Sequence, residues 1–177
     1  PDVKITIENG GKLIIDNSTL TKRCDDLWEG IIVKGDPNIH HLANSSTNGH
    51  LEIKNGSKIM YAKNAITIGD PFSNPYTTSG GYFTVENCSF INNRISIHCY
   101  PYQFMHRGWI KNCKFLNNTD LSYDTYKNKG TKVGIKLWGT TGLPIRGCEF
   151  TNSTPNSSLT DIDGIFDDKG RGTAIRI

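Results

Sequence analysis

The sequence predicts an all-β fold made of repeated coils, and three observations lead to that prediction. First, helix formers are scarce: the 177 residues include only 4 Ala, 5 Glu, 2 Met and 1 Gln, against 21 Ile, 17 Asn, 17 Thr and 18 Gly. Second, short segments of alternating apolar residues recur along the chain, each followed by a small turn residue. Third, another apolar motif follows each of these segments. Every repeat therefore supplies about three short strands.

Five segments line up along the chain. Each one is predicted to form a short strand of period two, a corner at a small anchor residue, and a second strand. They are Leu13–Leu20, Leu51–Ile59, Phe83–Phe90, Trp109–Phe115 and Leu143–Phe150. The anchors at positions 17, 55, 87, 112 and 147 are separated by 38, 32, 25 and 35 residues, so the insertions are expected in loops.

The third strand of each repeat is predicted from the apolar motif that follows the anchor. These motifs are Gly30–Val33, Ala65–Ile68, Ile95–Cys99, Gly134–Leu137 and Ala174–Ile177. A meander of hairpins would need tight Asn-Gly type turns at near-constant spacing, and these segments lack them. Parallel stacking of one coil on the next fits better, because each coil then buries its inward residues against its neighbours.

The anchor residues support stacked corners on physical grounds. Asn tolerates the left-handed region that a sharp corner requires, stacked Asn amides can bond along the column, and Gly147 fits the same corner. The position after the corner is small in every repeat: Ser18, Gly56, Cys88, Cys113 and Cys148. Two positions further on, an apolar stack is predicted from Leu20, Phe90, Phe115 and Phe150, with Ile59 displaced by one. The stacked cysteines come within disulfide range, but buried free thiols are favoured, since three sulfurs cannot all pair.

With these columns, the chain resembles a right-handed single-stranded parallel β-helix, the solenoid of pectate-lyase-like proteins, over roughly residues 3 to 177. It is most similar to Asn-rich β-helix segments of secreted Bacteroidetes proteins, in which phrases such as Gly11–Leu20 and Leu27–Gly35 are familiar. The resemblance implies about five coils with about three short strands each. It also implies a secreted or cell-surface location and the type IX secretion machinery as a partner.

The length suits a single domain over residues 1–177. The last apolar alternation, Ala174–Ile177, carries no turn or charged cap, so we expect a piece of a longer solenoid or multidomain secreted protein. No apolar run approaches the roughly 18 residues of a membrane span. The net charge is only +3, and the sequence has no run of basic residues that could form a nucleic-acid-binding arm. We therefore expect neither a membrane span nor a nucleic-acid partner.

Catalysis on acidic polysaccharides would need aligned carboxylates, or calcium carboxylates with a Lys or Arg base. The outward positions of the anchor strands hold a mixed column, which we interpret as a solvated face: Asp16, Glu52, Glu86, Lys111 and Arg146. Of the polygalacturonase phrases, Asn-Thr-Asp occurs once, at residues 118–120, while Gly-His-Gly and Arg-Ile-Lys are absent. We assign no catalytic residue and lean towards a non-enzymatic protein.

One acidic run is a candidate metal site. Asp161, Asp163, Asp167 and Asp168 could hold a calcium ion in a loop, and no other cofactor is expected. The run lacks the spacing of a helix-loop-helix calcium site, and a solvated loop is the favoured alternative. The histidines have no metal-ligand spacing, and we expect them in surface loops.

Aromatic loops are the better functional candidate. Phe72 and Tyr76 lie in the insertion at 70–82, and Tyr100, Tyr102 and Phe104 lie in the connection at 100–106. Such rings can stack on sugars or fill a protein interface, although they could also merely cover the side of the helix. The predicted function is an extracellular non-enzymatic module: a rigid surface, adhesin segment or glycan-binding face with a polysaccharide or cell-surface partner. The alternative is a polysaccharide lyase or glycoside hydrolase with catalytic residues partly outside this segment.

Overall fold

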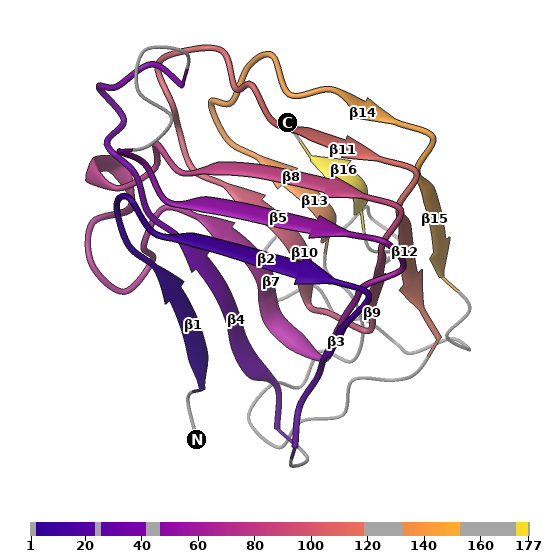
Figure 1. Ribbon diagram of the computed structural model, residues 1–177. Coiled ribbons are helices and arrows are strands. Elements are labelled where there is room, and N and C mark those ends of the chain that lie inside the picture. Colours follow the sequence, from indigo (N-terminus) through magenta and orange to yellow (C-terminus); the bar gives the residue numbers. More distant parts are fainter. Residues whose placement is uncertain (1–2, 24–25, 42–46, 119–132, 153–172, 177) are drawn as a thin grey trace.

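The computed structural model describes residues 3–23, 26–41, 47–118, 133–152 and 173–176. The chain winds through three parallel sheets in turn, and Figure 1 shows the coils stacked as a right-handed parallel β-helix. This confirms the predicted fold of about five coils with three strands each. Within the described ranges no helix is long and apolar enough to cross a membrane.

Each coil contributes one strand to each of the three sheets, which we call A, B and C. Sheet A has the order β1 (Lys4–Ile7), β4 (Trp28–Val33), β7 (Ala62–Ile68), β10 (Ile95–Cys99), β13 (Val133–Leu137) and β16 (Thr173–Arg176). Sheet B has the order β2 (Lys12–Asp16), β5 (His50–Lys54), β8 (Tyr82–Glu86), β11 (Trp109–Lys111) and β14 (Ile145–Arg146). Sheet C has the order β3 (Thr19–Leu20), β6 (Lys58–Met60), β9 (Ser89–Ile91), β12 (Lys114–Asn117) and β15 (Glu149–Asn152).

Inward side chains of the same register position form continuous apolar columns. In sheet A, Ile66 pairs with both Ile31 and Ile97, and all three are fully buried. In sheet C, the ring of Phe115 stacks on Phe90 at 5.0 Å and on Phe150 at 4.7 Å between centroids. Each coil is too thin to bury these residues alone, so the stacking of coils creates the core.

The predicted corners between sheets B and C are confirmed. Asn17, Asn55, Asn87 and Asn112 have φ between 43° and 55°, and Gly147 has φ 63°. A Cβ atom on Gly147 would lie 2.4 Å from Asn112 Oδ1, which explains why glycine occupies that corner. The side chain of Asn55 donates to Asp16 Oδ1 of the preceding coil at 2.8 Å, rather than to the stacked amide that we expected.

The small inward position after the corner differs from the prediction in one coil. The corner at Asn55 contains the additional residue Gly56, and Ser57 therefore occupies the column instead. Ser57 is fully buried, and its hydroxyl oxygen accepts a hydrogen bond from Ser18 N at 3.2 Å. Cys88 and Cys113 are free thiols that donate to the carbonyls of Glu86 and Lys111, at 2.9 and 3.1 Å.

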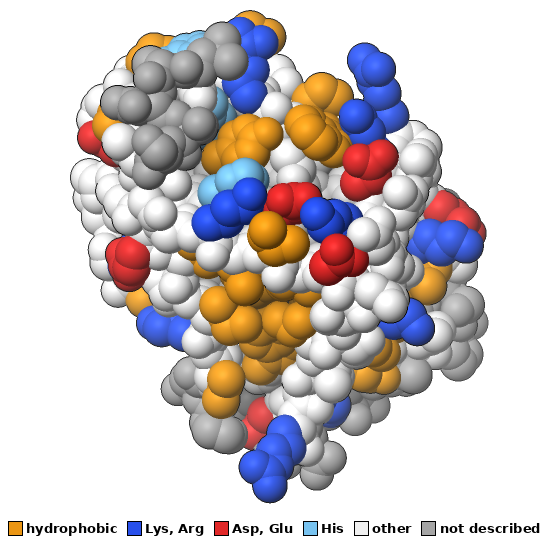
Figure 2. All heavy atoms as spheres, viewed as in Figure 1, with side chains coloured by type: hydrophobic (Ala, Val, Ile, Leu, Met, Phe, Trp, Pro, Cys, Tyr) orange, Lys and Arg blue, Asp and Glu red, His pale blue; other side chains and the backbone are white. Residues whose placement is uncertain are grey.

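The first coil leaves a hollow of about 360 Å³ at its open end. Its apolar wall includes Val3, Ile5, Leu20, Leu27 and Trp28, and Figure 2 shows hydrophobic side chains gathered on this face. The indole Nε1 of Trp28 donates to Met60 O at 2.8 Å, which ties the rim of the hollow to the next coil.

Candidate functional site

The structure brings two of the five predicted aromatic residues together with one that the sequence analysis did not select. Tyr76, Tyr100 and Trp138 form a group that we call the aromatic surface. The ring centroid of Tyr76 lies 6.3 Å from that of Tyr100 and 5.6 Å from that of Trp138, and the latter two are 6.2 Å apart. Tyr76 and Trp138 keep 50% and 48% of their surface exposed, so their rings are available to a ligand.

Parallel register explains why these residues meet. Tyr100 and Trp138 directly follow β10 and β13, and their backbone N–H groups donate to Ile68 O and Cys99 O of the preceding coils. The equivalent residue after β7 is Gly69, with φ 103°, where an added Cβ would lie 3.3 Å from Cδ2 of Tyr100. Glycine at this position leaves room for the Tyr100 ring.

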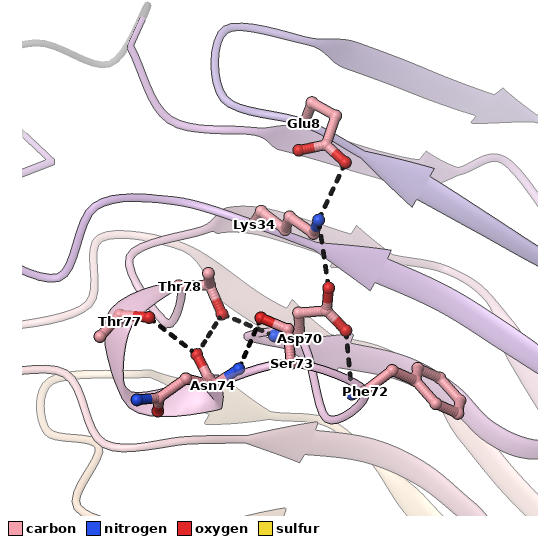
Figure 3. A network of polar contacts seen from close by, with 8 residues as sticks. All are labelled: Glu8, Lys34, Asp70, Phe72, Ser73, Asn74, Thr77 and Thr78. Carbon is pink, nitrogen blue, oxygen red and sulfur yellow. Dashed lines mark hydrogen bonds and ion pairs between the residues drawn. The ribbon is translucent and has the colours of Figure 1, made fainter.

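Tyr76 reaches the same place from the insertion at 70–82. A short 3-10 helix, Pro75–Thr77, is capped by Asn74, whose side chain accepts from Tyr76 N at 3.0 Å. Thr78 Oγ1 donates to Asn74 O and accepts from Asp70 N, which closes the part of the insertion at 70–78 into a loop (Figure 3). Tyr76 is therefore held by a hydrogen-bonded loop rather than by core packing.

An ion-pair network fixes the base of that loop to two earlier coils. Lys34 Nζ lies 3.0 Å from Glu8 Oε1 and 3.1 Å from Asp70 Oδ2 (Figure 3). Hydrogen bonds to Glu8 and Asp70 raise the pKa of Lys34. Burial opposes ionisation of Asp70, but the hydrogen bond from Phe72 N and the contact with Lys34 keep the pKa of this carboxyl below its ordinary value. Lys34 and Asp70 are therefore both charged at neutral pH.

Beneath the aromatic surface lies a buried histidine. The ring of His98 is 4.4 Å from that of Tyr100, and its Nε2 is buried without a hydrogen-bond partner. Burial, with a contribution from the charge of Lys136, lowers the pKa of His98 to about 4. The imidazole is thus neutral at neutral pH and supplies shape rather than charge.

The other predicted aromatic residues lie elsewhere. Phe72 is 56% exposed, with Lys4 Nζ 4.2 Å from its ring centroid, and it points away from Asn74 and the short helix (Figure 3). Tyr102 is only 4% exposed, and its hydroxyl donates to Ile39 O and accepts from His41 N. Phe104 makes an edge contact with Tyr102, at 5.7 Å between centroids. Tyr102 therefore ties two loops together and offers almost no surface to a ligand.

Two histidines expected on the surface are buried around Tyr102. A backbone N–H can only donate, so Nδ1 of His41 accepts from Arg107 N, and Nε2 donates to Gly80 O. In the same way, Nδ1 of His106 accepts from Gly108 N while Nε2 donates to Gly81 O. Burial lowers the pKa of His41, and burial together with His41 lowers that of His106 to about 3. Both rings are neutral structural groups.

Several carboxylates of the described residues form ion pairs with lysines. Glu29 contacts Lys63, and Glu52 Oε1 lies 2.6 Å from Lys54 Nζ. The predicted outward column needs one correction: Lys54, not Glu52, pairs with Asp16, because Glu52 pairs with Ile14. The candidate calcium ligands Asp161, Asp163, Asp167 and Asp168 lie outside the described residues. Among those that are described, no three potential ligands gather as a metal site would require.

Comparisons of the chain with protein families, with curated proteins and with solved structures gave no match. The sequence did contain a signal for Trp138: it follows Gly134–Leu137 just as Tyr100 follows Ile95–Cys99. Extending the alignment of the third strands by one residue would have found it.

Proposed function

We propose that this chain is a non-enzymatic extracellular β-helix module that binds glycans on its aromatic surface. The observation that carries the proposal is the grouping of the exposed rings of Tyr76 and Trp138 with the partly exposed ring of Tyr100, beside the ends of β10 and β13. Large exposed apolar groups gathered at one place on a protein commonly mark a binding surface. Rings that combine an apolar face with a polar edge suit the faces and hydroxyls of sugars.

The inclined arrangement of the rings supports stacking of a sugar ring on one of them rather than contact with a flat partner. Tyr76 stands at 72° to Tyr100 and at 78° to Trp138, so it forms a wall beside them. Tyr100 and Trp138 are inclined to each other by 43°. A sugar could stack on one ring while its edge contacts the wall, and the Tyr hydroxyls could bond to its hydroxyls.

Secretion and lineage belong to the same proposal. We place the module in a secreted pectate-lyase-like solenoid of a Bacteroidetes bacterium, exported by the type IX route to the cell surface, on the resemblance of Gly11–Leu20 and Leu27–Gly35. A parallel β-helix suits a surface or adhesin segment because its stacked coils present a rigid face. Immunodetection in the outer-surface fraction of the source organism tests this part, and a purely cytoplasmic location would contradict it.

Trp138→Ala tests the binding site. With 48% of Trp138 exposed, a side chain of about 250 Å² offers roughly 120 Å². Covering half of that area at about 25 cal/mol per Å² contributes about 1.5 kcal/mol, so we expect the substitution to weaken glycan binding about tenfold. The measurement is a glycan-array screen, followed by titration of the best ligand.

Phe72→Ala is the matched control, since it removes an equally exposed ring outside the aromatic surface. Its affinity should equal that of the unmodified chain. Equal losses in the two variants, or no glycan binding at all, would refute the proposal. The same glycans should also be checked for unsaturated or reducing-end products, because turnover would show an enzyme instead.

A further inference from the structure

A second surface feature, which we call the basic pocket, lies on sheet B where β11 and β14 run side by side (Figure 1). It has a volume of about 260 Å³, and its lining includes His106, Arg107, Trp109, Lys111 and Arg146. Ile110 is fully buried in the core. Because side chains alternate along a strand, Trp109 and Lys111 on either side of it project outwards into this feature.

The lining of the basic pocket contains cations but no acid. Lys111 and Arg146 are register partners on adjacent strands, and Arg107 adds a third cation from the preceding loop. No carboxylate lines the pocket, and within the described part of the chain none of these three cations forms an ion pair. Glu86, the acid nearest in register, flanks Lys111 on the side away from Arg146. Cations so placed repel one another unless an anion lies between them.

The uncharged lining of the pocket includes an indole whose N–H makes no hydrogen bond. Trp109 Nε1 is buried and has no hydrogen-bond partner, while Lys111 Nζ lies 4.6 Å from the centroid of the same indole. His106 contributes no charge, because both of its ring nitrogens are already bonded to backbone groups. The pocket therefore combines three cations with an indole that lies beside one of them, and no acid lines it.

We propose that the basic pocket binds a tetrahedral oxyanion, a sulfate or phosphate group, between Arg107, Lys111 and Arg146. Three cations match the charge of about −2 on such a group better than the single charge of a carboxylate. A planar carboxylate is satisfied by one bidentate Arg, which would leave the remaining cations unpaired. This site lies on a different sheet from the strands that carry the aromatic surface, and it does not depend on glycan binding there.

The indole N–H of Trp109 gives a direct readout. The ¹⁵N-labelled chain is titrated with sodium sulfate or inorganic phosphate against sodium chloride at matched ionic strength, and the three indole N–H signals are followed by NMR. Trp109→Phe identifies its signal by removing it. We expect a saturable shift of the Trp109 signal with sulfate and phosphate, and none with chloride.

Substitutions in the pocket test the role of the cations. Arg107→Gln and Arg146→Gln remove exposed side chains, so both variants should keep the spectrum of the folded chain. Each should weaken anion binding about tenfold, as expected for losing one charge-assisted hydrogen bond. Lys58→Gln on β6 makes the same change of net charge away from the pocket and should bind within twofold of the unmodified chain.

Three outcomes of these titrations would contradict the proposal. The proposal is overturned by the absence of saturable binding, by binding that leaves the Trp109 signal unmoved, or by equal weakening in Lys58→Gln. A sulfated monosaccharide and a phosphate monoester, titrated in parallel with the free ions, then distinguish an ester-linked group from a free anion. Tighter binding of either ester at the Trp109 signal identifies the natural source of the oxyanion.

Discussion

Acid should destabilise this fold through His106. The ring is fully buried, and both nitrogens are engaged as one donor and one acceptor, so the added proton of an imidazolium would displace the hydrogen bond from Gly108 N. In the folded chain the pKa is lowered to about 3, whereas in the unfolded chain it returns to 6.5. Between these values the unfolded state binds more protons, so the free energy of unfolding falls as the pH drops below about 6.5.

The expected size follows from the linkage relation. At pH 4.5, two units below the unfolded-state value, His106 should cost about 2.7 kcal/mol at about 1.36 kcal/mol per unit. The loss continues towards pH 3, and the full contribution is present above about pH 6.5. His98, whose pKa is about 4, acts in the same direction, as do His41 and His50, whose pKa values are also lowered by burial.

Equilibrium urea unfolding at pH 4.5 and pH 7.5 measures this effect. His106→Asn should be less stable at pH 7.5, but the difference in unfolding free energy between the two pH values should shrink by about 2.7 kcal/mol relative to the unmodified chain. Ile97→Val is the control, since it removes a core methylene group at a cost of about 1 kcal/mol without a titrating group. An unchanged pH difference in His106→Asn would refute the reasoning.

Two further predictions concern a buried hydroxyl and the stacked phenylalanine rings. Tyr102→Phe removes the hydroxyl that bonds Ile39 O and His41 N. Leaving these two groups unsatisfied should lower the free energy of unfolding in urea by about 1–3 kcal/mol. Glycan binding by the folded variant should be unchanged, and a selective loss of binding would mean that Tyr102 contacts the ligand. Phe115→Ala opens a cavity between Phe90 and Phe150. The free energy of unfolding in the same assay should fall by about 3–5 kcal/mol. A decrease below about 1 kcal/mol would show that the stacked rings are not a packed core.

The sequence was sufficient to predict the coils because their constraints are local. A left-handed corner admits few residues, so Asn87 and Asn112 marked their positions without any knowledge of the tertiary structure. The inward-facing residues could then be predicted from the corners, because successive side chains along a strand point to opposite faces of the sheet. The one error in the small column arose where Gly56 adds a residue to a corner, which moves Ser57 inwards.

The site was harder to predict because it depends on contacts between distant loops. Tyr102 and His41 are 61 residues apart, and nothing near either residue indicates that the tyrosine hydroxyl will be buried against the other loop. The same limitation hid the burial of His106. Trp138 has a weaker sequence signal for a different reason: it stands alone after a strand, whereas Tyr76 and Tyr100 lie in segments that contain several aromatic residues.

The parallel register of the three sheets has a mechanical consequence. The hydrogen bonds between neighbouring coils run roughly along the axis of the solenoid, in all three sheets at once. A force that pulls one coil away from the next along that axis loads these bonds simultaneously, whereas a force applied to one chain terminus can break them in sequence. The same molecule should therefore resist traction across its stacked faces far better than peeling from an end.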